Sequence, residues 1–95
     1  NRRKLEMTEE AISKFASKVT QQIKFDIEEA QISLNYVETR LHDYHEELAK
    51  DVSKKDYYEV SRSLGSCNDY RIQKAELEGR IKALKLTLQH IEGLL

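Results

Sequence analysis

The sequence predicts an all-α protein: an antiparallel two-helix coiled-coil hairpin that dimerises into an elongated four-helix bundle. Two features of the composition favour helices. Among 95 residues there are 3 glycines and no proline, and 35% of the residues are charged. The third observation is the spacing of the apolar residues, which recur every three or four positions over two long stretches. A chain of this length forms one small domain, which we place at residues 8–95.

The first stretch predicts a helix over residues 8–50. Its apolar residues follow one side of a helix: Ile12, Phe15, Val19, Ile23, Ile27, Ala30, Leu34, Val37, Leu41, Tyr44 and Leu48. The Thr8 hydroxyl can cap the first turn, where Glu9 and Glu10 favour the positive end of the helix dipole. The basic segment 1–7 is interpreted as a lead-in outside the helix and a candidate for disorder.

A turn over residues 51–53 is predicted to join the two helices. Ser53 is a candidate N-cap for the second helix, with Asp56 three residues later as a short-armed capping-box partner. A connection this short makes the helices adjacent and antiparallel. With the turn centred near residue 52, residue i is expected to face residue 104 minus i.

The second stretch predicts a helix over residues 54–93. Its apolar residues form two blocks that are out of phase with each other: Tyr57, Val60, Leu64 and Cys67, then Leu77, Ile81, Leu84, Leu88, Ile91 and Leu95. The phase is lost at residues 63–69. Two interpretations stay open: a continuous helix that is kinked there, or a helix that ends at Gly65 and a new one capped by Ser66. The length of the first helix favours the continuous helix.

Six apolar residues outside these stripes form the predicted interface: Phe25, Ile32 and Tyr36 from the first helix, and Ile72, Ala75 and Leu86 from the second. In the predicted register the two groups lie at the same height, as one broad apolar belt. A hairpin with a single row of packed side chains leaves this belt in water, so a second copy or a partner helix is expected to cover it. The alternative is a set of scattered exposed apolar residues, which are ordinary on protein surfaces.

One cluster resembles a metal site, with imidazole and carboxylate groups one helical turn apart: Glu38, His42, His45 and Glu46. His42, His45 and Glu46 are the candidate ligands. They lie beside the apolar stripe, however, where coiled coils usually carry solvated polar groups, so we predict no metal and no cofactor. Cys67 lies on the stripe and is expected to be a small buried side chain. No pattern indicates catalytic residues, and we expect no enzymatic activity.

The charge pattern argues against nucleic acid as a partner, because the net charge is -1 and both signs are interspersed. No apolar run reaches the ~18 residues that a membrane span needs. The sequence therefore favours a protein–protein interaction module, an assembly, adaptor or scaffold element that binds a protein partner or a second copy. The alternative is a membrane-surface or curvature-sensing helical dimer, with Lys14, Lys18 and Lys24 as its basic face. The single cysteine cannot form an intrachain disulfide, so nothing indicates a secreted disulfide-stabilised scaffold, and we expect an intracellular, cytoplasmic protein.

Overall fold

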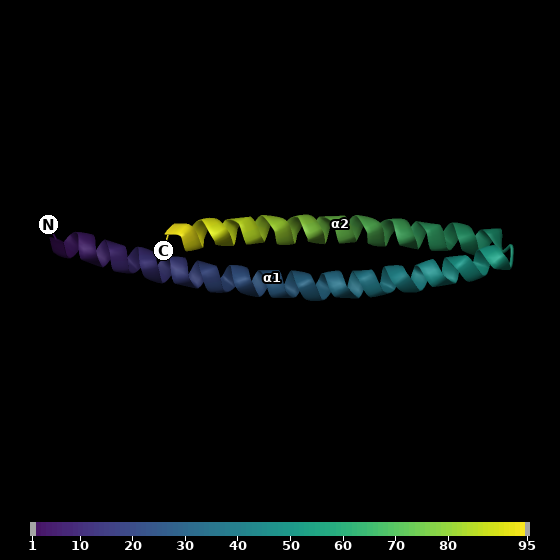
Figure 1. The fold of residues 1–95 in the computed structure, drawn as a ribbon, viewed down its shortest axis with the longest axis horizontal. Coiled ribbons are helices and arrows are strands. Elements are labelled where there is room, and N and C mark those ends of the chain that lie inside the picture. Colours follow the sequence, from purple (N-terminus) through teal and green to yellow (C-terminus); the bar gives the residue numbers. More distant parts are fainter. Residues whose placement is uncertain (1, 95) are drawn as a thin grey trace.

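The computed structural model describes the backbone of residues 2–94 and the side chains of residues 8–93. Two helices make up this part of the chain, α1 (Arg2–Ser53) and α2 (Tyr57–Leu94), and they lie antiparallel and side by side (Figure 1). The hairpin measures 79 Å along its longest axis and 16 and 14 Å across. The predicted all-α helical hairpin is confirmed.

Helix α1 is longer at both ends than the predicted helix 8–50. It begins at Arg2, because the basic lead-in consists mostly of strong helix formers and contains no glycine or proline. With 52 residues against 38 in α2, its N-terminal turns extend past the end of α2 (Figure 1). Ile12 and Phe15, which were expected to pack against the second helix, are exposed.

The connection between the helices lies at residues 54–56, three residues later than predicted. The Lys55 N–H donates to the Val52 carbonyl and the Asp56 N–H donates to the Asp51 carbonyl, both at 3.1 Å. These two bonds form a Schellman motif, which places its next-to-last residue in the left-handed conformation; Lys55 has a φ of 57°. Sequence reasoning missed this turn because glycine is the usual residue there.

Asp56, and not Ser53, caps the second helix. The Asp56 carboxylate accepts a hydrogen bond from the backbone N–H of Glu59 at 3.2 Å, and its carbonyl accepts one from Val60 at 2.9 Å. Ser53 lies in the last turn of α1. The predicted turn was wrong because two pairs of residues have the spacing of a capping box. Ser53 and Asp56 have it, and so do Asp56 and Glu59, three residues later.

Helix α2 is continuous through Gly65, and no glycine in the described chain has a positive φ. All but two of its buried and half-buried positions follow one unbroken 3-4 repeat: Val60, Ser63, Cys67, Tyr70, Lys74, Leu77, Ile81, Leu84, Leu88 and Ile91. The other two, Glu59 and Ser66, each lie next to a residue of the repeat. Leu64, predicted to face the first helix, is 53% exposed, whereas its neighbour Ser63 is buried. The apparent loss of phase arose because the polar residues Ser63 and Lys74 occupy two positions of the repeat.

We call the row of side chains packed between the helices the seam. Its core lies in the middle of the hairpin, where Ala30 and Leu34 pack around Ile81 and Leu77 adds to the cluster. This packing places Ile32 level with residues near Ile81. The predicted register, in which Ile32 faces residue 72, is therefore wrong. The later turn accounts for part of the difference.

Two polar contacts and an aromatic pair fix the same register elsewhere along the seam. Near the turn the Ser63 hydroxyl donates to the Asp51 carboxylate at 3.3 Å. Two turns further along, Tyr44 stacks on Tyr70 with ring centroids 5.6 Å apart. At the open end the Lys24 ammonium lies 4.0 Å from the carboxylate of Glu92.

Replacing Lys55 by glycine is expected to stabilise the hairpin. A left-handed residue with a Cβ carries strain of about 1 kcal/mol, which glycine does not. We expect Lys55→Gly to raise the midpoint of thermal unfolding, followed by circular dichroism, by about 4 °C. Lys54→Gly is the matched control, because Lys54 has no positive φ and gains nothing. A melting temperature for Lys55→Gly at or below that of Lys54→Gly would contradict the turn geometry.

Two leucines test the phase of the seam. Leu41 is 8% exposed in the seam, and Leu64 is 53% exposed beside it. We expect Leu41→Ala to lower the free energy of unfolding by about 2–5 kcal/mol, because it opens a cavity in a narrow core. Leu64→Ala should cost less than about 1 kcal/mol in the same denaturant titration. Equal losses for the two variants would mean that the seam has been assigned the wrong phase.

Candidate interaction surface

The residues of the predicted interface are all exposed. On α1, Phe25, Ile32 and Tyr36 have exposed fractions of 53%, 70% and 61%; we call these three the outer row of α1. On α2, the corresponding outer row consists of Ile72, Ala75 and Leu86, with exposed fractions of 55% for Ile72 and 49% for Leu86. Neither row contributes to the seam, so both are available to contact another molecule.

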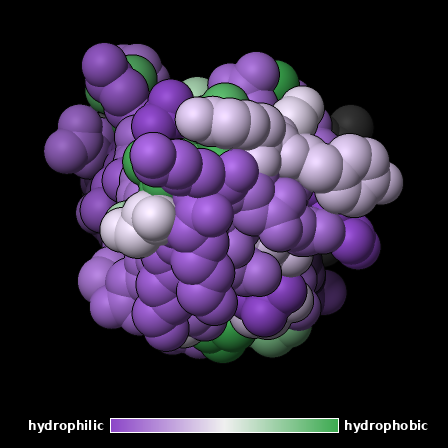
Figure 2. Space-filling model, turned by 90° about the vertical axis from the view of Figure 1, so that its right-hand side faces the viewer, coloured by the Kyte–Doolittle hydropathy of each residue, from purple (hydrophilic) through white to green (hydrophobic). Residues whose placement is uncertain are grey.

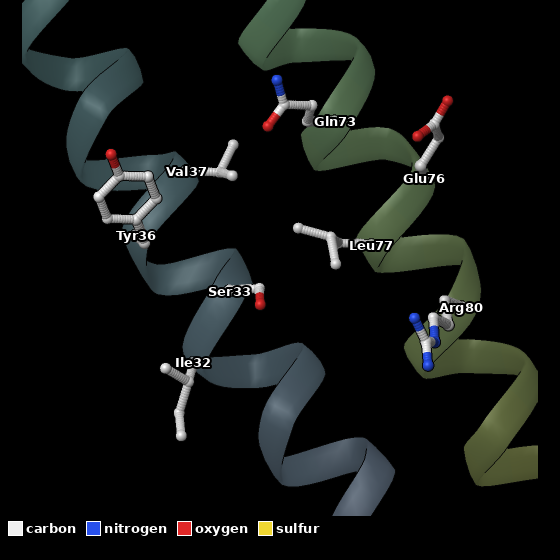
Figure 3. Close-up of a pocket in the computed structure, with 8 residues that line it drawn as sticks. All are labelled: Ile32, Ser33, Tyr36, Val37, Gln73, Glu76, Leu77 and Arg80. Carbon is white, nitrogen blue, oxygen red and sulfur yellow. The ribbon is translucent and has the colours of Figure 1, made fainter.

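The structure separates the two rows. With Ile27 at heptad position a and Ala30 at d, Phe25 and Ile32 occupy position f, which points away from the partner helix. Figure 3 shows Ile32 and Tyr36 on the side of α1 remote from α2, while Val37 and Leu77 point into the space between the helices. Ile72 and Leu86 occupy the same position on α2. The expected single belt is therefore two surfaces on opposite outer sides of the hairpin.

The outer row of α1 borders a groove between the helices (Figure 3). Val37 and Leu77 line its apolar part, and Gln73, Glu76 and Arg80 of α2 supply polar groups along the opposite edge. Ile32 and Tyr36 form the edge on α1.

The outer row of α2 is less continuous. Gly79 lies between Ile72 and Leu86, and a Cβ built on Gly79 would have no atom within 4 Å, so the surface there is open. The outer row of α2 also has only two large apolar side chains, Ile72 and Leu86, against three on α1. The outer row of α1 therefore offers the larger apolar surface to a partner.

A cluster of Arg40, Tyr44 and Tyr70 was missed by sequence reasoning. The Arg40 guanidinium lies 5.3 Å from the centroid of the Tyr44 ring and 3.4 Å from its hydroxyl. The polar interaction of its guanidinium with the Tyr70 side chain raises the pKa of Arg40 above its ordinary value. The sequence signal was Tyr44 in the first apolar stripe, whereas Tyr70 lies between the two blocks of the second. The cluster stabilises the seam near the turn and is only partly accessible to other molecules.

The candidate metal ligands do not converge. His42 lies 3.2 Å from the carboxylate of Glu46, whereas the His45 ring nitrogen lies 3.5 Å from the Arg71 guanidinium of α2. Among the described residues, no group of three or more histidine, cysteine, aspartate or glutamate side chains is placed to hold a metal ion. Cys67 is buried in the seam, as its position on the stripe predicted.

The turn end of the hairpin carries mostly hydrophilic residues at its surface (Figure 2). Tyr57 and Tyr58, at the start of α2, are exposed there. The outer apolar rows thus lie along the sides of the hairpin and away from its tip. Over the described residues, neither helix has a segment that is both long and apolar enough to cross a lipid bilayer.

Comparison of the chain with models of protein families, with curated proteins and with solved structures finds no match.

Proposed function

We propose that this chain is a non-enzymatic protein–protein interaction module, an assembly, adaptor or scaffold element that acts through helix packing. Its first partner is a second copy of the hairpin, and the pair forms an elongated four-helix assembly. The observation that carries this proposal is the outer row of α1, where three large apolar side chains are more than half exposed within 12 residues.

The size of this row supports an interface. Burying a phenylalanine, isoleucine or tyrosine side chain removes a large apolar area from water, and each fully buried aliphatic or phenylalanine side chain contributes about 1.5–3 kcal/mol. In a two-fold symmetric dimer every residue of the row is used twice, once from each copy. Single exposed apolar residues are ordinary, but a row on one side of a helix, bordered by a groove, is typical of a binding surface.

The remaining surface of the hairpin supports a role in binding. Its charged groups include pairs within one helix, such as Lys74 with Glu78 and Arg62 with Glu59, each at 3.9 Å. Such pairs keep a long helix soluble at small energetic gain. The apolar rows therefore stand out against a polar, solvated surface, and they are where a partner helix gains most by binding.

The proposal predicts a dimer in sedimentation equilibrium at micromolar concentration. Ile32→Asp should shift the protein toward the monomer, because it places a charge in the buried contact, while the helical circular dichroism signal is retained. Ile72→Asp is the matched control: it makes the same change at an exposed isoleucine on the outer row of α2, and it should leave the dimer intact.

Two outcomes would contradict the proposal. A wild-type chain that stays monomeric throughout the micromolar range would exclude self-association. A dimer that Ile72→Asp dissociates and Ile32→Asp leaves unchanged would place the interface on α2.

A further inference from the structure

The outer row of α1 belongs to a longer stripe that reaches the N-terminal turns of the helix. The stripe follows heptad positions c and f, so its residues recur with the same 3-4 spacing as the seam, on the opposite side of α1. It runs from Ala11 to Tyr36, and every residue on it is exposed. Ala11 and Phe15 lie at one end and Ile32 and Tyr36 at the other. α1 thus carries a second seam that no other helix of the described chain covers.

The order of residues along this stripe makes it complementary to itself in the antiparallel direction. When Phe15 is set opposite Ile32 of a second copy, Ala11 falls opposite Tyr36, the smallest side chain against the largest. In the same alignment Lys18 falls opposite Glu29, and this occurs twice because the arrangement is symmetric. Next to the two-fold axis, Phe25 meets Gln22. In a parallel alignment, by contrast, Lys18 would face Lys18 and Glu29 would face Glu29.

We propose that α1 binds α1 of a second copy through this stripe, antiparallel and in the register that sets Phe15 opposite Ile32; this inference rests on the self-association proposed above. The aligned stretch from residue 11 to residue 36 is about 38 Å long. Because the stripe lies opposite the seam, each hairpin keeps its own α1–α2 packing. The four helices then lie in the order α2, α1, α1, α2.

The proposal also gives the overhanging turns of α1 a partner. Ala11 and Phe15 lie in these turns on the side of α1 opposite the seam, and Phe15 is 70% exposed. In the proposed dimer these residues pack on Ile32 and Tyr36 of the second copy. The outer side of α2 lacks such a match, because Ile72 and Leu86 are two heptads apart with Gly79 between them.

Charge reversal tests the register. Lys18→Glu places two glutamates opposite each other on both sides of the two-fold axis, and Glu29→Lys does the same with two lysines. We expect each single variant to raise the dissociation constant of the dimer about tenfold at low salt, measured by sedimentation equilibrium. The double variant, which exchanges the two charges, should return the constant to within about threefold of the wild-type value.

Lys14→Glu and Glu28→Lys are the matched controls. They make the same charge changes at exposed positions outside the stripe and should leave the dissociation constant nearly unchanged. If the single variants weaken the dimer and the double variant does not restore it, the antiparallel register is wrong. A wild-type dimer insensitive to both single variants would overturn this interface and leave self-association standing. A wild-type monomer would overturn both proposals.

Discussion

The packing of α1 against α2 along a single narrow seam is the constraint on which the rest of the structure depends. A hairpin 16 Å by 14 Å in cross-section has room for one layer of side chains between its helices. The described chain has no large side chain that is completely buried, and the best-covered positions, such as Val37 and Cys67, still retain a few per cent of their surface. Stability therefore comes from the length of the seam, since each of its layers contributes little alone.

The register of that seam is specified by polar groups as well as by shape. The Asp51–Ser63 hydrogen bond links the helices next to the turn, and Lys74 occupies a seam position where an apolar residue would pack better. Polar residues at such positions lower stability but disfavour competing registers. Lys55 also lowers stability and helps to specify the register. The strained turn sets where α1 ends, and hence which residues of the two helices face each other.

The sequence was sufficient for the two helices and for most of the residues of the core, because apolar residues such as Leu34, Leu41 and Ile81 recur at helical spacing. It was insufficient for the turn, where a lysine takes a conformation usual for glycine. The N-cap of the second helix is Asp56, three residues later than the predicted N-cap Ser53. The same shift accounts for part of the error in the predicted register. The repeat of α2 was not recognised in full, because its positions 63 and 74 carry the polar residues Ser63 and Lys74. A search for apolar residues alone does not find polar residues in the seam.

The candidate interaction surface, too, was predicted only in part from the sequence. Periodicity identified the six exposed residues that do not fit the seam, and the structure leaves all six accessible. Their division into two outer rows depended on the three-dimensional register and could not be derived from spacing in one helix. The proposed complementarity of the α1 stripe to itself follows from the sequence order of Phe15, Lys18, Glu29 and Ile32. It could be recognised only once the structure had placed α2 on the opposite side of α1.

The central claim, that two hairpins meet antiparallel along α1, is tested most directly by one distance in the dimer. A spin label is attached at Glu38→Cys in a Cys67→Ser background, because Glu38 is exposed and lies outside the stripe. In the proposed register residue 38 is level with residue 9 of the other copy, so pulsed electron resonance should give a separation of about 45 Å between the labels. A separation of about 20 Å or less would mean that the copies are parallel, and it would contradict this account.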